Sequence, residues 1–173
     1  MSESLIVQES PWAGRRLTTR WMPAAFVPPR ELTTQAYGVC FTEHRKIVLV
    51  TTGDGRWDLP GGHPEANETL AAALERQVWE EARARVIRSQ YIGCQQIDAP
   101  DAVEGPKLYY QARFWARVEV YPFKALFETI DRRLVDLDEL LDTLFWGDLP
   151  IAKVVLDCGL AVENQRGSPC LWG

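Results

Sequence analysis

The chain has 173 residues, of which 46% are hydrophobic and 25% are charged, and its formal net charge at pH 7 is -5. This length suits one domain, and the apolar content is enough for a packed core, which excludes a globally disordered chain. Proteins that bind nucleic acid polymers usually carry excess positive charge, so the acidic balance argues against that class of partner. An acidic chain can still bind a phosphate-bearing small molecule when a divalent cation supplies the positive charge.

Residues 1–33 predict an irregular N-terminal arm. Four prolines interrupt any periodic pattern there, while Trp12 and Trp21 favour burial, so we expect the arm to pack on the domain that follows. The first 16 residues do not resemble a signal peptide, the apolar runs are too short to cross a bilayer, and the four cysteines form no zinc pattern. We therefore expect a cytoplasmic protein without a membrane partner, and such an arm is compatible with a homodimer.

The next part of the chain, residues 34–163, predicts a domain of strands and helices, and residues 164–173 predict a loose tail. Segments rich in β-branched and aromatic residues predict strands at 33–41, 46–52, 56–59, 86–97 and 108–121. Apolar residues at helical spacing predict helices at 69–82, 136–145 and 150–162. This order is typical of an α/β (α+β) domain in which helices cover a sheet.

The segment from Gly61 to Glu81 carries the residues that predict chemistry. Because a helix turns by about 100° per residue, Gln77, Glu80 and Glu81 point to the same side. Adjacent carboxylates repel each other unless they share a cation, and oxygen donors suit Mg²⁺ or Mn²⁺. The backbone of Gly61 and Gly62 can offer a carbonyl to the metal and an amide to an anion. A metal held in this way predicts hydrolysis of a phosphoanhydride, although either feature alone is also typical of a solvated surface or a turn.

The spacing of these residues resembles the Nudix box. Gly62 is followed after five residues by Glu68, and Glu68 is followed after seven residues by Arg76, four positions before the Glu80-Glu81 doublet. The resemblance extends over about residues 34–160 and implies an α/β/α sandwich with a mixed β-sheet. It also implies a hydrolase that uses Mg²⁺ or Mn²⁺ and cleaves a nucleoside diphosphate linked to another moiety, a nucleotide-type small-molecule substrate.

The residue types and their spacing, together with this resemblance, predict roles for individual residues. The predicted catalytic residues are Glu80, Glu81, Arg76 and Glu128. The predicted metal-binding residues are Gly61, Glu68, Gln77, Glu80 and Glu81. The predicted substrate-binding residues are Gly62, His63 and Trp146. Glu128 is included because family members often add a carboxylate from this part of the chain, but Glu104 and Glu119 are rivals, so the catalytic base stays unassigned.

Two positions depart from the family pattern. Gln77 stands where members carry glutamate, and a glutamine keeps one carbonyl oxygen but cannot accept a proton. If that group were the base, its loss would cost on the order of 10²- to 10⁴-fold in rate. The alternative is therefore a catalytically inactive module that binds or senses a nucleotide or sugar nucleotide. Arg83 stands where members carry glycine, so we expect the helix either to continue or to end with strain.

Overall fold

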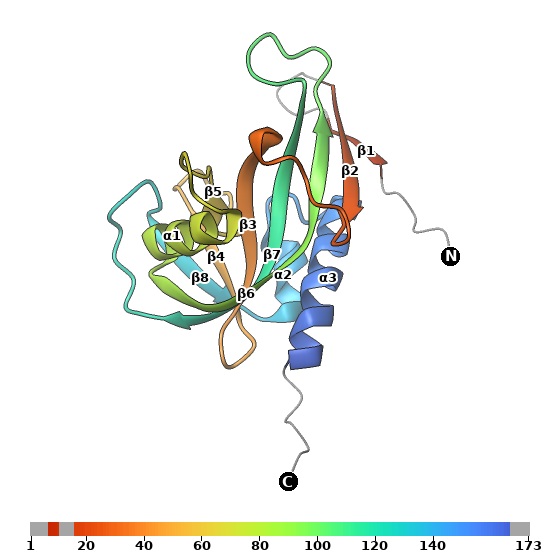
Figure 1. Ribbon diagram of the computed structural model, residues 1–173. Coiled ribbons are helices and arrows are strands. Elements are labelled where there is room, and N and C mark those ends of the chain that lie inside the picture. Colours follow the sequence, from red (N-terminus) through yellow and green to blue (C-terminus); the bar gives the residue numbers. More distant parts are fainter. Residues whose placement is uncertain (1–6, 11–15, 167–173) are drawn as a thin grey trace.

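The computed structural model describes residues 7–10 and 16–166 of the chain. Its strands are β1 (Val7–Ser10), β2 (Leu17–Pro23), β3 (Thr33–Phe41), β4 (Ile47–Thr51), β5 (Gly61–Gly62), β6 (Ala84–Asp98), β7 (Leu108–Val120) and β8 (Asp131–Val135). Its helices are α1 (Leu70–Ala82), α2 (Leu140–Thr143) and α3 (Pro150–Arg166), with short 3-10 helices at Arg30–Leu32 and Leu137–Glu139. The strands form one sheet in the order β1-β2-β6-β7-β3-β4-β8, and β5 pairs beside β3 (Figure 1). Because β3 and β7 are parallel while the other pairs are antiparallel, the sheet is mixed, as expected.

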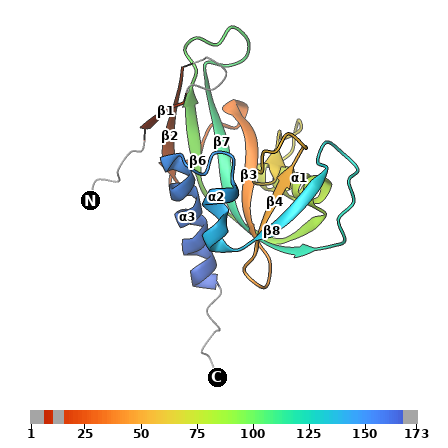
Figure 2. The ribbon, with the colours of Figure 1, turned by 180° about the vertical axis from the view of Figure 1, so that it is seen from behind.

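Helices cover both faces of this sheet. Successive side chains of a strand point to opposite faces, so the apolar strand β4 serves two cores. Val48 and Val50 belong to the apolar cluster that includes Leu74 of α1. Ile47 and Leu49 belong to the cluster formed with α2 and α3 on the other face. The two ribbon views show α1 on one side of the sheet and α3 on the other, which confirms the α/β/α sandwich (Figures 1 and 2).

The mid-chain helix has the predicted position and clear ends. The hydroxyl of Thr69 accepts a hydrogen bond from the backbone N–H of Ala72 and caps the start of α1. The helix ends at Ala82, because Arg83 adopts a left-handed conformation with φ 49° and ψ 46°. Of the two expected outcomes at Arg83, the strained ending is therefore the one observed. Arg132 of β8 donates to the carbonyl of Ala82 at 2.8 Å and so secures this end of the helix.

Three sequence-based expectations about local structure are wrong. The segment 17–23 is not irregular but forms β2, because its backbone pairs with β6 from Thr18 opposite Asp98 to Pro23 opposite Gly93. The segment 131–135, for which no strand was predicted, forms β8 through pairing with β4. Helix α3 continues to Arg166, past the predicted end at 162 and into the predicted tail.

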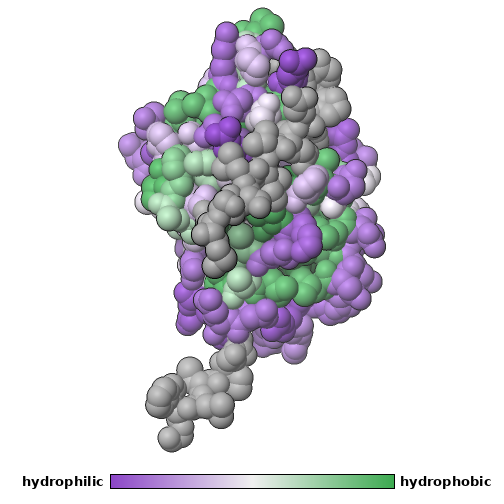
Figure 3. Space-filling model, turned by 90° about the vertical axis from the view of Figure 1, so that its right-hand side faces the viewer, coloured by the Kyte–Doolittle hydropathy of each residue, from purple (hydrophilic) through white to green (hydrophobic). Residues whose placement is uncertain are grey.

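Other expectations about the two ends of the chain have mixed outcomes. Trp21 is buried, as expected, whereas Trp12 and residues 167–173 lie outside the described residues. The division into arm, domain and tail stays a prediction. The side of the molecule on which β2 and α3 lie presents a mixture of hydrophilic and hydrophobic residues (Figure 3). Within residues 7–10 and 16–166, no helix is both long enough and apolar enough to span a bilayer.

Candidate active site

Two adjacent glycines bring the loop before α1 close to the sheet and to the helix. A Cβ atom at Gly61 would lie 2.2 Å from the carbonyl oxygen of Ala36, so no larger residue fits against β3 at this point. A Cβ atom at Gly62 would lie 2.7 Å from the side-chain nitrogen of Gln77. The amide of Gln77 therefore rests against the backbone of Gly62. These close approaches place the glycine loop beside the helix face that carries the box residues.

Arg76 ties the loop to the helix. Its Nε and Nη2 atoms donate to the two carboxylate oxygens of Glu68 at 2.8 and 2.9 Å, and Nη2 also donates to the carbonyl of His63 at 3.0 Å. Its Nη1 atom donates to Glu80 at 3.4 Å. Hydrogen bonds from Arg76 and from the backbone N–H of Glu65 lower the pKa of Glu68 to about 2. The side chain of Glu68 thus holds Arg76 in place, and its role as a metal ligand stays a prediction.

Glu81 is the box carboxylate whose pKa is raised. Its Oε2 atom accepts a hydrogen bond from the backbone N–H of Gly61 at 3.1 Å, which favours the ionised form. Burial opposes this, and the negative charges of Asp58, Glu128 and Glu80 add to its effect, so the pKa of Glu81 is raised to about 7. Asp58, Glu128 and Glu80 therefore lie close enough to Glu81 for their charges to disfavour its ionised form.

Glu81 lines a cavity of about 230 Å³, here called the carboxylate cavity. Its other polar lining includes Asp58, Gly61 and Glu128. The structure thus brings the predicted residues Gly61, Glu81 and Glu128 to one cavity, although Glu128 itself is exposed. Glu119, a rival for the base, instead pairs with Arg85 at 2.7 Å. In the part of the chain that the structure describes, no three His, Cys, Asp or Glu side chains already converge as a metal site.

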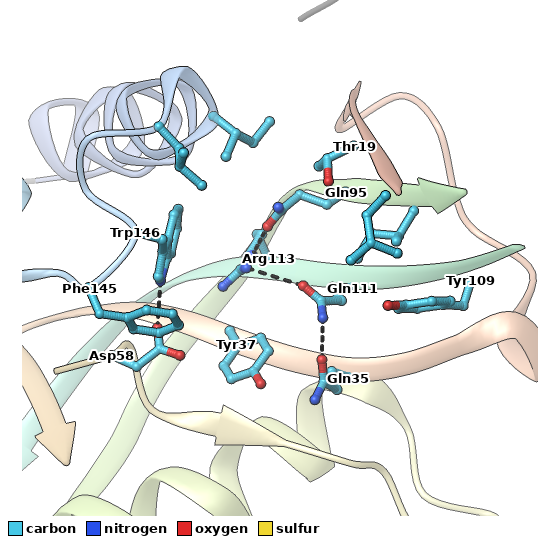
Figure 4. A pocket seen from close by; sticks show the side chains of 14 residues that line it. Thr19, Gln35, Tyr37, Asp58, Gln95, Tyr109, Gln111, Arg113, Phe145 and Trp146 are labelled. Atoms are coloured by element: carbon cyan, nitrogen blue, oxygen red, sulfur yellow. Dashed lines mark hydrogen bonds between the residues drawn. The ribbon is translucent and has the colours of Figure 1, made fainter. Parts of the chain in front are cut away.

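A second cavity of about 280 Å³, here called the arginine cavity, lies next to the first (Figure 4). It is bounded by β2, β3, β6 and β7 and by the segment 145–151. Arg113 lies in it and is only 4% exposed. The Oδ1 atom of Asp58 accepts a hydrogen bond from Nε1 of Trp146 at 2.8 Å. The two cavities share the residues Tyr37, Asp58 and Phe145.

The predicted substrate-binding residues have different positions. Trp146 lines the arginine cavity. His63 is exposed and lies outside the lining of both cavities, and its carbonyl serves as an acceptor for Arg76. Gly62 is buried against Gln77 and lies outside both linings as well.

The sequence-based reasoning missed Asp58 and Arg113. A signal for Arg113 exists in the predicted strand 108–121, where this arginine stands between Ala112 and Phe114. A charged residue within an apolar strand that is covered on both faces indicates a buried cation, and buried cations need a partner. Asp58 carries a weaker signal, since it directly precedes the Leu-Pro-Gly-Gly segment that leads into the site.

Comparisons with known proteins agree with this geometry. A family model described as the NUDIX domain matches residues 31–155. A curated relative, the phosphatase NudJ of Escherichia coli strain K12, is 37% identical over 65 residues, a match that covers 36% of this chain and 42% of NudJ. The chain therefore spans less than half the length of the curated relatives it matches.

Solved structures share the fold at low sequence identity. A Bacillus subtilis pyrophosphohydrolase superposes with a TM-score of 0.72 at 21% identity, covering 91% of this chain and 98% of that one. A NUDIX hydrolase from Nitrosomonas europaea superposes with a TM-score of 0.59 at 18% identity, covering 75% and 90% of the two chains.

Proposed function

This chain belongs to the NUDIX domain family, and from that premise we propose that it is a hydrolase that uses a divalent metal and cleaves a phosphoanhydride bond. The proposed substrate is a nucleoside diphosphate linked to another moiety. The observation that carries the proposal is the position of Glu81, a largely buried carboxylate in a cavity with Asp58 and Glu128. The names of the NudJ phosphatase and of the Bacillus pyrophosphohydrolase support the same class of reaction.

The residues in and beside the carboxylate cavity fit a hard divalent cation, although Glu80 and Gln77 do not line the cavity itself. Burial, and to a smaller extent the charges of neighbouring carboxylates, raise the pKa of Glu81 to about 7, and a cation bound here would favour its ionised form. We propose that Glu80, Glu81 and the Gly61 carbonyl hold Mg²⁺ or Mn²⁺, with the amide oxygen of Gln77 as a neutral donor. When bound, the ion supplies positive charge to the diphosphate and acidifies a water molecule.

The other residues of the site position these groups. Arg76 holds the Glu80 carboxylate and pins the loop through Glu68, so that α1 and the loop move as one unit. In the proposed reaction, a water oxygen attacks one phosphorus atom, the bridging oxygen leaves with the other phosphate, and a carboxylate accepts the proton of the water. Glu128 and Glu81 both line the cavity, so either can accept that proton.

A second function, binding or sensing a nucleotide or sugar nucleotide without cleavage, is favoured by Gln77. Its side chain occupies the helix face next to Gly62 but brings no negative charge to the site. Such a module would hold an intact ligand, and calorimetry followed by chromatography of the ligand distinguishes it from an enzyme.

The proposal is tested by incubating the purified chain and Mg²⁺ or Mn²⁺ with nucleoside diphosphates that carry sugar, nucleoside or phosphate groups. We expect product formation that falls by at least about 100-fold in Glu81→Gln, since the cation and a proton acceptor are both affected. Glu75→Gln is the matched control, because Glu75 is an exposed residue of the same helix and lies outside both cavities. If Glu81→Gln is as active as wild type, the proposed active site is wrong. If Gln77→Glu hydrolyses a substrate and the wild-type chain does not, the wild-type chain is the binding module.

A further inference from the structure

Arg113 is a buried cation with an unused hydrogen-bond donor. Its Nε atom donates to Oε1 of Gln95 at 2.7 Å, and its Nη2 atom donates to Oε1 of Gln111 at 3.4 Å. Its Nη1 atom is buried and has no hydrogen-bond partner. Buried polar groups in native proteins nearly always have partners, so an unpaired guanidinium N–H on a residue that lines a cavity points to a ligand that accepts a hydrogen bond there.

Two aromatic rings and three amides fix the direction of this donor. The guanidinium carbon lies 4.7 Å from the ring centre of Tyr37 and 5.0 Å from that of Trp146, and the group projects between these rings (Figure 4). The side-chain nitrogen of Gln111 in turn donates to Oε1 of Gln35. The amide oxygens on this side of the cavity therefore already accept hydrogen bonds from protein donors. The cavity presents N–H groups to a ligand in this region.

The charges in the cavity favour a neutral acceptor over a phosphate. Asp58 lies in the same cavity, and its negative charge acts on Arg113 and partly balances it. The negative charge of Asp58 would repel a phosphate bound to Arg113. The carbonyl oxygen of a neutral ring carries no net charge and would be repelled much less. The aromatic and aliphatic lining, which includes Tyr109 and Ile97, suits a flat ring.

The position of the arginine cavity makes it the place for the base of a nucleotide. It shares Tyr37, Asp58 and Phe145 with the carboxylate cavity, where the proposed function places the phosphates. A nucleotide whose phosphates lie near Glu81 can therefore extend past these residues toward Arg113.

We propose that the arginine cavity binds the base of the substrate nucleotide and that Arg113 selects a base with a keto edge, as in guanine, over adenine; this rests on the proposed function. Guanine presents two acceptors, O6 and N7, on the edge that arginine recognises. Adenine replaces O6 with an amino group, which would place a donor against the donor of Arg113 and leave both unpaired.

The test measures the binding of nucleoside monophosphates by calorimetry in the presence of a metal chelator, so that hydrolysis plays no part. We expect guanosine and inosine monophosphates to bind at least about tenfold more tightly than adenosine monophosphate, since a good arginine–guanine pair discriminates by this much or more. Inosine monophosphate carries the keto group without the 2-amino group of guanine, so it isolates the contribution of the keto edge.

Variants assign the preference to Arg113. In Arg113→Met, we expect the two affinities to differ by less than about threefold. Arg85→Met is the matched control, because Arg85 is an exposed arginine of the neighbouring strand β6, and it is expected to keep the wild-type ratio. Circular dichroism verifies folding. If the methionine variant does not fold, Arg113→Leu replaces it, and the comparison of bases on the wild-type chain tests the preference by itself.

Four results overturn the inference, and the first three concern binding and the variant. They are equal binding of the adenine and keto nucleotides to the wild-type chain, no binding of any monophosphate at millimolar concentration, and an unchanged preference in a folded Arg113 variant. Displacement of guanosine monophosphate by inorganic phosphate alone, with no dependence on the base, would also overturn it. Because no metal and no reaction are involved, a chain that fails to hydrolyse any substrate can still show the preference, so the two proposals fail separately.

Discussion

Replacing Arg83 by glycine and by alanine separates the backbone strain at the end of α1 from the contacts of the side chain. The left-handed conformation of Arg83, with φ 49°, costs an L-residue about 1–2 kcal/mol. Glycine avoids this cost but loses about 0.5–1 kcal/mol more backbone entropy on folding than alanine does. We therefore expect Arg83→Gly to have a free energy of unfolding about 0.5–1 kcal/mol higher than that of Arg83→Ala.

The side chain itself has a contact that both variants lose. The guanidinium of Arg83 lies 5.1 Å from the ring centre of Trp79, which is 40% exposed. Such a pair contributes about 0.5–1 kcal/mol at an exposed site. We therefore expect Arg83→Gly to be close to wild type in stability and Arg83→Ala to be less stable than wild type by about 0.5–1 kcal/mol.

Urea denaturation followed by circular dichroism measures these differences. The same pair of substitutions at Arg88, an exposed residue of β6, is the control. There we expect the opposite order, with alanine more stable, because glycine weakens a strand. If Arg83→Ala proves as stable as Arg83→Gly, the left-handed backbone costs no more than the extra entropy that glycine loses, and the expected difference is refuted.

Two further predictions concern buried carboxylates. Glu163 is fully buried and accepts hydrogen bonds from Trp115 at 2.9 Å and Arg117 at 2.6 Å, so Glu163→Ala should lower the free energy of unfolding in urea by about 3 kcal/mol. Glu163→Gln keeps an acceptor and should cost less, and equal losses would contradict this account. Burial raises the pKa of Asp58, although the hydrogen bond from Trp146 opposes the shift. The protonated Asp58 therefore stabilises the folded state at low pH, and this stabilisation is lost as the pH rises through the raised pKa. Urea midpoints should therefore show that Asp58→Asn gains stability relative to wild type as the pH rises from the ordinary carboxyl pKa through the raised pKa of Asp58, and a constant difference would count against this account.

The sequence was most informative where the determinants of structure lie close together in the chain. The helical spacing of apolar residues and the cap at Thr69 are local, and they place α1 and its glycine loop correctly. Strands β2 and β8 were not predicted, because each forms by pairing with a strand that is distant in the sequence. Strand β2 pairs with β6, more than 70 residues away, and β8 pairs with β4, about 80 residues away. The charged residues of β8 also conceal its strand character, since they are tolerated at the edge of a sheet.

The same distinction holds for the site. The contact of Arg76 with Glu80 follows from helix geometry, and the box spacing predicted that Glu68 belongs to the same group. Glu128 was one of several candidates, and only the fold brings it to the cavity of Glu81. Arg113 could not be assigned to a cavity from sequence, because the walls around it come from segments that are distant in the chain.

The wall between the two cavities limits how proteins of this architecture can change their substrate. Tyr37, Asp58 and Phe145 line both cavities, so under the two proposals a mutation in any of them is expected to affect recognition of the base and hydrolysis together. Gln95 of β6 and Gln111 of β7 line the arginine cavity but not the carboxylate cavity. Evolution can therefore vary these strands to accept new ligands while the reaction chemistry is inherited intact.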